Sequence, residues 1–200
     1  MKQTITKLSV LALSALATLI LPSFGAFAAS ITTNTTINGS VGSAITITTN
    51  GSVALSVIPN SGALMSTTSD TVTVNTNNTA GYSLLLSMTG ATNVLNGPAG
   101  NTIAPAVGSL AVPATLAANQ WGYRIDNYSN FGVATTTVVN SVPTSGTWAK
   151  VPVLLSAETI KNRNGTATND ITTVWYAMNI DASKPTGSYT NTVVYTATTN

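Results

Sequence analysis

The side chains that most often carry out catalysis are scarce in this chain. Its 200 residues include no cysteine and no histidine, which excludes a Cys/His zinc site, a cysteine nucleophile and a Ser-His-Asp triad. Five acids remain, of which Asp126 and Glu158 could act as general acid and base in a glycosidase. However, Asp126, Asp170 and Asp181 fall at predicted strand ends, where aspartate commonly binds turn backbone. We therefore expect a protein that is not an enzyme.

Metal ions and cofactors have little to bind in this sequence. A calcium site needs several converging oxygen ligands, and the chain has no Asp-x-Asp-x-Asp run. We expect no cofactor and no metal ion.

The tryptophans are the best candidates for ligand contacts. Trp121, Trp148 and Trp175 could offer faces on which sugars stack, since an aromatic ring combines apolar area with a polar rim. Trp175 and Tyr176 are neighbours on a predicted strand and must point to opposite faces, and Trp121 and Tyr176 suit a core. Trp148 follows Gly146-Thr147 at a predicted loop edge, so Trp148, together with Tyr128, is the predicted exposed contact for a glycan or a host protein.

A covalent cross-link between lysine and asparagine, promoted by a carboxylate, is a further option for a surface protein. Lys150 or Lys161 with Glu158 would be the material for it. The spacing of these residues shows nothing specific, so ordinary solvated charges explain them as well.

The charge balance argues against nucleic acid and anionic lipid as partners. Seven basic and five acidic residues give a formal charge of +2. Without Lys2 and Lys7, which lie in a segment that we expect to be removed, five bases and five acids give zero. A neutral chain attracts polyanions weakly.

The N-terminal segment has the order of features of a secretory signal peptide. A basic start is followed by the apolar run 8–21, then by Pro22 and Gly25, and Ala26 and Ala28 supply the small residues of a cleavage site. The alternative is an uncleaved membrane anchor, since about 20 apolar residues span a bilayer. We expect cleavage after residue 28, no membrane insertion afterwards, and a product that is secreted or held at the extracellular cell surface.

The rest of the chain is patterned for strands and turns. It is rich in threonine, which suits a pleated surface, and in asparagine, which suits turns. Apolar residues alternate within several runs. The predicted strands are 44–49, 53–57, 70–76, 82–88, 121–126, 151–155, 172–181 and 189–197.

Two of the connections read as hairpins and two as long loops. Asn50-Gly51 predicts a hairpin between 44–49 and 53–57. A Lys-Pro-Thr-Gly turn at 184–187 predicts a second one that closes the chain. Prolines punctuate 90–118, which reads as a crossover, and 127–147 reads as an extended loop; 156–161 could form one helical turn at most.

These patterns predict an all-β fold. About eight short strands separated by turns are typical of an antiparallel β-sandwich, Ig-like or jelly-roll-like, here following a cleaved N-terminal signal helix. We expect one sandwich domain over 44–200. Residues 29–43 form either an N-terminal extension or a first strand.

Four motifs carry a resemblance to a known group of proteins. They are, in order, Val72-Thr73-Val74-Asn75-Thr76-Asn77-Asn78-Thr79-Ala80-Gly81-Tyr82-Ser83-Leu84, Ala118-Asn119-Gln120-Trp121-Gly122-Tyr123-Arg124-Ile125-Asp126, Thr173-Val174-Trp175-Tyr176-Ala177 and Pro185-Thr186-Gly187-Ser188-Tyr189-Thr190-Asn191-Thr192-Val193. In these motifs the chain resembles exported, Thr-rich β-proteins of ultrasmall candidate-phylum bacteria of the Saccharibacteria type. The resemblance implies a surface β-sandwich and supplies no catalytic residues.

A weaker similarity is to pilin subunits of the spore-coat-U type. It lies in the closing Pro-x-Gly-x-Tyr turn and the Thr/Val strand after it. Those pilins usually contain cysteines, and this chain departs from them in having none. Ser30 to Val41, with Ile31, Ile37 and Val41 at even spacing, could be a strand given to a neighbouring molecule; the alternatives are a first strand of its own sheet and a loose leader.

The function that these observations favour is structural. We expect a non-enzymatic surface structural or adhesion protein, one form of which is a self-assembling subunit of a surface layer or fibre. The alternative is a monomeric module that binds a carbohydrate or a protein through loop aromatics. A carbohydrate-active enzyme is the weakest alternative.

Overall fold

The computed structural model describes residues 31–60, 62–126, 128, 130–131 and 135–200. The predicted signal peptide, with Ala26 and Ala28 at its cleavage site, lies outside these residues. Residues 41–200 form one compact unit, separate from the residues that precede them. Residues 31–40 are in no helix or strand and are all exposed.

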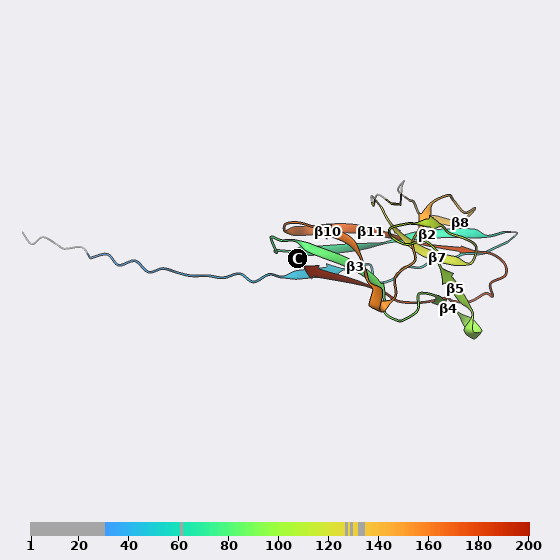
Figure 1. The fold of residues 1–200 in the computed structure, drawn as a ribbon, viewed down its shortest axis with the longest axis horizontal. Helices are drawn as coiled ribbons and strands as arrows, with labels where there is room; N and C mark the ends of the chain where they lie inside the picture. Colours follow the sequence, from blue (N-terminus) through green and yellow to red (C-terminus); the bar gives the residue numbers. More distant parts are fainter. Residues whose placement is uncertain (1–30, 61, 127, 129, 132–134) are drawn as a thin grey trace, which may run out of the picture. The chain divides into compact units, whose positions relative to one another are not determined.

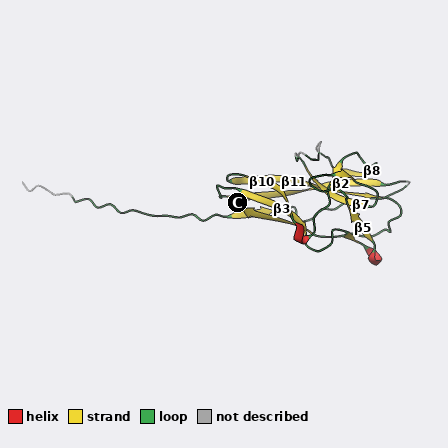
Figure 2. Cartoon of the chain, in the orientation of Figure 1, coloured by secondary structure: helices red, strands yellow, loops and turns green. Residues whose placement is uncertain are grey.

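The fold is all-β, as Figures 1 and 2 show. The larger sheet has seven strands in the order β1-β2-β11-β7-β5-β4, with β8 also on β2. Only the β5–β7 pair in it is parallel. Its strands are β1 (Ile45–Thr48), β2 (Leu64–Thr76), β4 (Leu95–Asn96), β5 (Thr102–Pro105), β7 (Gln120–Ile125), β8 (Val138–Ser141) and β11 (Ala167–Ile180).

A smaller sheet of three antiparallel strands has the order β10-β3-β12. These strands are β3 (Tyr82–Met88), β10 (Glu158–Arg163) and β12 (Val193–Thr199). A separate pair joins β6 (Ala114–Thr115) to β9 (Thr147–Trp148), and the short 3-10 helices η1 (Pro98–Gly100) and η2 (Leu154–Ser156) lie in the connections.

The main core is built by the inward side chains of both sheets. Val72, Val74 and Val174 of the larger sheet and Leu84 and Leu86 of the smaller are completely buried in one cluster. Every second residue of a strand points to the same face, which is why the alternation in the sequence marked these residues. A second cluster on the other face of the larger sheet contains Met65, Trp148 and Ala177.

Neither predicted hairpin forms. β1 pairs with the end of β2, from Ile45 opposite Thr76 to Thr48 opposite Thr73. Gly51 adopts the expected positive φ of 83°, but residues 51–59 continue without pairing because side chains bind their backbone instead. Likewise β11 pairs within the larger sheet and β12 with β3, so residues 181–192 cross from one sheet to the other.

The irregular regions contain more structure than the sequence predicts. Of the twelve strands that the structure describes, five begin within the segments 90–118 and 127–147, namely β4, β5, β6, β8 and β9. All five are short, between two and four residues, so no alternation marks them. The predicted strand at 151–155 is absent. Most of the suggested helical turn at 156–161 lies instead in β10, which covers Glu158–Arg163.

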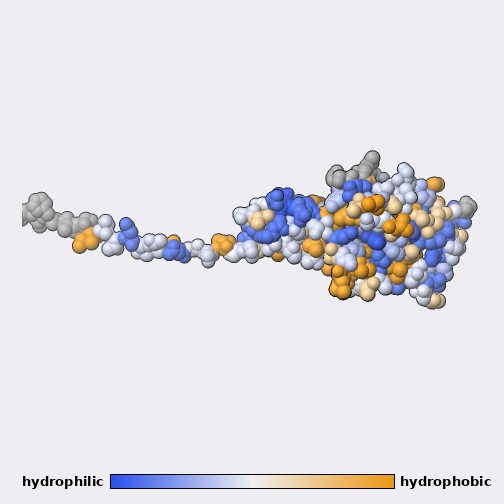
Figure 3. Space-filling model, viewed as in Figure 1, coloured by the Kyte–Doolittle hydropathy of each residue, from blue (hydrophilic) through white to orange (hydrophobic). Residues whose placement is uncertain are grey.

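Large apolar side chains are exposed at several places along the chain, and two of them are adjacent in η2. Leu154 and Leu155 of η2 are exposed to 50% and 95%. Hydrophobic residues gather on the surface in Figure 3 at the place that η2 has in Figure 1. No helix within the described ranges is long and apolar enough to cross a membrane.

Candidate functional site: a groove beside β12

A groove of about 790 Å³ opens between two extended segments of the compact unit. One wall is formed by residues 51–59, and the other by residues 184–193 and Tyr195 at the start of β12. Trp121, Tyr176 and Met178 are on its floor. The groove therefore lies over the core-facing side of the larger sheet, next to the last strand of the smaller one.

The edge of β12 that faces away from β3 is unpaired. In an antiparallel ladder, alternate residues bind a given neighbour. Thr192 O accepts the Thr89 amide and the Asn200 amide donates to Gly81 O, both at 3.1 Å, so even-numbered residues bind the β3 side. Val193 and Tyr195 therefore direct their backbone N–H and C=O groups outward, and these groups have no backbone partner among the described residues.

The opposite wall is an extended segment that does not pair as a strand. Val53, Leu55 and Val57 are half-buried against the core, and the residues between them are exposed. This is the alternation that predicted a strand at 53–57. Side chains hold the segment to the larger sheet: Asp70 Oδ1 accepts the Asn50 amide at 3.0 Å, and Asn140 Oδ1 accepts the Ile58 amide at 2.7 Å.

A polar network forms part of the groove lining. The Tyr176 and Tyr195 hydroxyls are 2.7 Å apart, and the Asp70 carboxylate, only 4% exposed, interacts with Tyr195. Burial, with Tyr176 and Asp70 nearby, raises the pKa of Tyr195 far above its usual range. Burial also raises the pKa of Tyr176. Both phenols therefore stay neutral at any ordinary pH.

Trp148, which the sequence predicts to be an exposed contact, is buried, and only 1% of it is exposed. The Arg124 guanidinium lies 5.7 Å from the centre of its ring and 5.8 Å from that of Phe131. Tyr128 is half-buried and its ring packs 6.2 Å from that of Phe131. The structure thus joins both predicted residues through Phe131 and Arg124, but Trp148 is part of the second core cluster rather than of a ligand surface. The sequence predicts a loop edge at Gly146-Thr147 because β9, with only two residues, is too short to show a strand pattern.

Arg124 is a charged residue whose burial the sequence did not indicate. It is 3% exposed and its Nη2 donates to Phe131 O at 2.9 Å. Burial lowers the pKa of Arg124, while nearby Asp126 acts against this.

Asp126 and Glu158 do not form a catalytic pair. Asp126 accepts hydrogen bonds from the Trp175 indole and from the Thr135 amide, whereas Glu158 accepts one from the Tyr123 hydroxyl at 3.2 Å. Tyr123 belongs to the main core and Trp175 packs on the second cluster. The larger sheet therefore lies between the two carboxylates.

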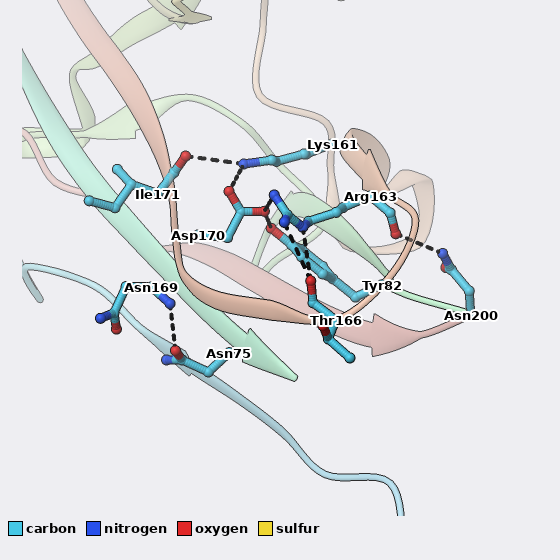
Figure 4. Close-up of polar contacts among 9 residues, drawn as sticks. All are labelled: Asn75, Tyr82, Lys161, Arg163, Thr166, Asn169, Asp170, Ile171 and Asn200. Carbon is cyan, nitrogen blue, oxygen red and sulfur yellow. Dashed lines mark hydrogen bonds and ion pairs between the residues drawn. The ribbon is translucent and has the colours of Figure 1, made fainter. Parts of the chain in front are cut away.

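Asp181 and Asp170 have different kinds of partner. Asp181 accepts the amide and hydroxyl of Ser183 and caps a turn, as predicted. Asp170, in contrast, lies within β11 and forms the polar cluster of Figure 4: Lys161 Nζ is 2.7 Å from its Oδ1, the Tyr82 hydroxyl donates to its Oδ2 at 2.8 Å, and Arg163 is 3.4 Å away. Lys161 thus pairs with Asp170 and not with Glu158.

The contacts of Asp170 with Lys161 and Tyr82 are of a stabilising kind. Burial disfavours the charged form of Asp170, but the hydrogen bonds from Lys161 and Tyr82 outweigh this and hold the pKa of Asp170 below its usual range. No group of three or more acids that could hold a metal ion occurs in the part of the chain that the structure describes. The groove is therefore the strongest candidate for a functional surface.

The sequence signal that could have located the groove was present. The strand pattern at 53–57 and the Thr/Val pattern at the end of the chain mark its two walls, but pairing them as hairpins hid the space between them. No family model, no curated protein and no solved structure matches this chain.

Proposed function

We propose that this protein is a secreted, non-enzymatic subunit of a cell-surface structure, a β-sandwich of the Ig-like or jelly-roll-like kind that assembles with copies of itself. The observation that carries the proposal is the unpaired edge of β12 beside an open groove lined by both apolar and polar side chains. An edge strand with free N–H and C=O groups is a template for pairing with another chain, and natural sheets usually cover or charge it. Here the edge residues Val193, Val194 and Tyr195 carry no charge.

The low charge of the molecule supports assembly further. Only Asp70 and Lys184 among the groove residues are charged, and both are engaged, Asp70 with Asn50 and Lys184 with Thr102 O at 2.7 Å. Each of the two charges already has a hydrogen-bond partner, so covering the groove leaves neither of them without one. The N-terminal signal pattern supports export to the surface.

The test is the solution mass of residues 29–200, measured by light scattering on a sizing column over a range of concentrations. The expected result is a series of polymers, and electron microscopy of the same sample should show fibres or sheets. A chain that remains monomeric at every concentration contradicts self-assembly. The same measurement on a chain that lacks residues 29–43 tests whether assembly needs that segment. Because the described residues of the segment are exposed, we expect the polymers to be lost.

A second function has one observation in its favour. The volume of the groove lies in the range of small-molecule sites, which are roughly 300–1,000 Å³, and Trp121 and Tyr189 line it. A monomeric carbohydrate- or protein-binding module would use this groove rather than Trp148. Binding of glycans to a monomeric chain, abolished when the groove is filled, would favour it.

A further inference from the structure

We propose that residues 31–41 of one copy bind the groove of a second copy, lying along the start of β12 as a fourth strand of its smaller sheet. This inference rests on the self-assembly proposed above and names the two surfaces that meet.

The segment has the pattern that a strand in this groove requires. Successive side chains of a strand point to opposite faces, so the odd-numbered residues share one face and the even-numbered ones the other. The odd face is Ile31, Thr33, Thr35, Ile37, Gly39 and Val41, and the even face is Thr32, Asn34, Thr36, Asn38 and Ser40. All three large apolar side chains of the segment thus lie on the odd face, and the even face consists only of threonine, asparagine and serine.

The segment has apolar side chains that nothing covers. Ile31, Ile37 and Val41 are exposed to 87%, 91% and 91%. The segment contains no charged residue, so its burial requires no desolvation of a charge. Covering a large aliphatic side chain is favourable relative to leaving it in water, and the partly buried Leu55, Val57 and Met178 of the groove lining offer it apolar surface.

The groove supplies the backbone partners as well. Val193 and Tyr195 present outward N–H and C=O groups, as derived above from the β3 register. A strand added there would satisfy them by β-augmentation, in which main-chain hydrogen bonds give affinity and alternate side chains give specificity.

A groove in another copy is favoured over the chain's own groove. Residues 42–44 are held at the end of β2, because Asn77 binds Gly42 O at 3.0 Å and the Ala44 amide at 2.7 Å. From there β1 runs along β2 toward Thr49, where the groove begins. Entering its own groove would require the chain to reverse direction at the residues that Asn77 fixes.

The contact is heterologous, because the segment and the groove are different surfaces. A contact of this kind does not close on itself in a pair and propagates into open chains unless a ring forms. The proposal therefore predicts growth of a chain and not a symmetric dimer.

The test uses two variants of residues 29–200 that are each defective in one surface. Ile37→Asp places a charge on the odd face of a fully exposed segment, and Val193→Pro removes an outward N–H from β12, where an edge strand tolerates proline. Each variant alone should be monomeric. An equimolar mixture should form a dimer that contains one copy of each, and nothing larger, because only one complete segment and one complete groove are then available.

Two controls keep the outcome interpretable. Thr36→Asp puts the same charge on the even face and should still polymerise. Ala182→Trp, at an exposed residue that lines the groove, is a second groove variant that leaves the core and the β12 backbone intact, and it should behave as Val193→Pro does.

The results separate this proposal from the one it rests on. If the unmodified chain polymerises but Ile37→Asp or Ala182→Trp also does, the occupant assigned here is wrong and assembly uses another surface. If the unmodified chain stays monomeric, both proposals are overturned. A mixed dimer from two monomeric variants supports both.

Discussion

The hydroxyl oxygens of Tyr176 and Tyr195 lie 2.7 Å apart, and this contact joins β11 of the larger sheet to β12 of the smaller sheet. Asp70 interacts with the same Tyr195 hydroxyl from β2. The groove lining thus contains a hydrogen-bonded tie between the sheets, and Tyr195 of this tie is also a residue of the unpaired strand edge.

Replacing Tyr195 by Phe should break this tie. The buried Asp70 carboxylate then keeps the Asn50 amide but loses the hydroxyl, and an unsatisfied buried acceptor costs about 1–3 kcal/mol. Urea unfolding should show a loss of that size. Tyr189→Phe is the matched control, since its hydroxyl donates to Pro185 O in an exposed contact and its loss should cost under about 1 kcal/mol. Equal losses in the two variants would contradict the role of the network.

Asp170→Asn should change how stability depends on pH. The pKa of Asp170 is lowered in the folded chain, so the stability that its charge contributes is present above its unfolded pKa of about 3.9 and is lost as the pH falls through the folded value. Unfolding free energies of the native chain and the variant should differ by about 1–2 kcal/mol near pH 7. The difference should shrink below about pH 4.

A matched variant shows whether Lys161 is the partner. Lys161→Met removes the 2.7 Å contact and should reduce the same pH-dependent difference, whereas Lys150→Met should leave it unchanged. A difference between native chain and Asp170→Asn that stays constant down to pH 2 would argue against a stabilising charge at Asp170.

Gly81→Ala should destabilise the turn between β2 and β3. Gly81 has φ of 94°, and an added Cβ would lie 1.8 Å from Arg163 O. Positive φ alone costs a residue with a side chain about 1–2 kcal/mol, and the clash adds to it, so thermal unfolding should show a loss above about 2 kcal/mol. Gly165→Ala is the control, because Gly165 has φ of 82° but open space around it. A smaller effect at Gly81 than at Gly165 would contradict the packing described.

Trp148→Ala should behave as a core substitution. Removal of a buried tryptophan typically costs about 3–5 kcal/mol, and the cation–π contact with Arg124 is lost as well. Leu155→Ala, at a residue that is 95% exposed, should change stability by under about 0.5 kcal/mol. Both are measured by chemical unfolding; a neutral Trp148→Ala would place the indole at the surface after all.

The sequence predicts the strands in which apolar and polar residues alternate, but it does not predict which strands pair with each other. The strand at 82–88 and the strand near 121–126 agree with β3 and β7 within a residue, because their apolar residues recur at every second position. Pairing was assigned wrongly because turn signals such as Asn50-Gly51 describe local backbone and not the partner that a strand finds. At Asn50 the partner is the Asp70 side chain, 20 residues away.

For the same reason, the sequence indicated the N-terminal segment of the proposed contact but not the groove. Ile31, Ile37 and Val41 could be recognised as an apolar face from their spacing. The groove depends on β12 joining β3 and not β11, which is a long-range choice. Trp148 was misplaced because a two-residue strand leaves no periodic signal, while its burial results from Met65 and Ala177 of the second cluster and from Arg124, which no local pattern connects to it.

The order of the smaller sheet determines how the molecule must fold. β3, β10 and β12 pair only with one another, and none of them follows another directly along the chain. No local hairpin can therefore nucleate this sheet, and its pairings wait until distant segments meet. High contact order slows folding to the millisecond-to-second range. Because the connections on either side of β3 and between β10, β11 and β12 all lead from one sheet to the other, melting of one sheet releases the other, and unfolding of residues 41–200 should be a single cooperative step.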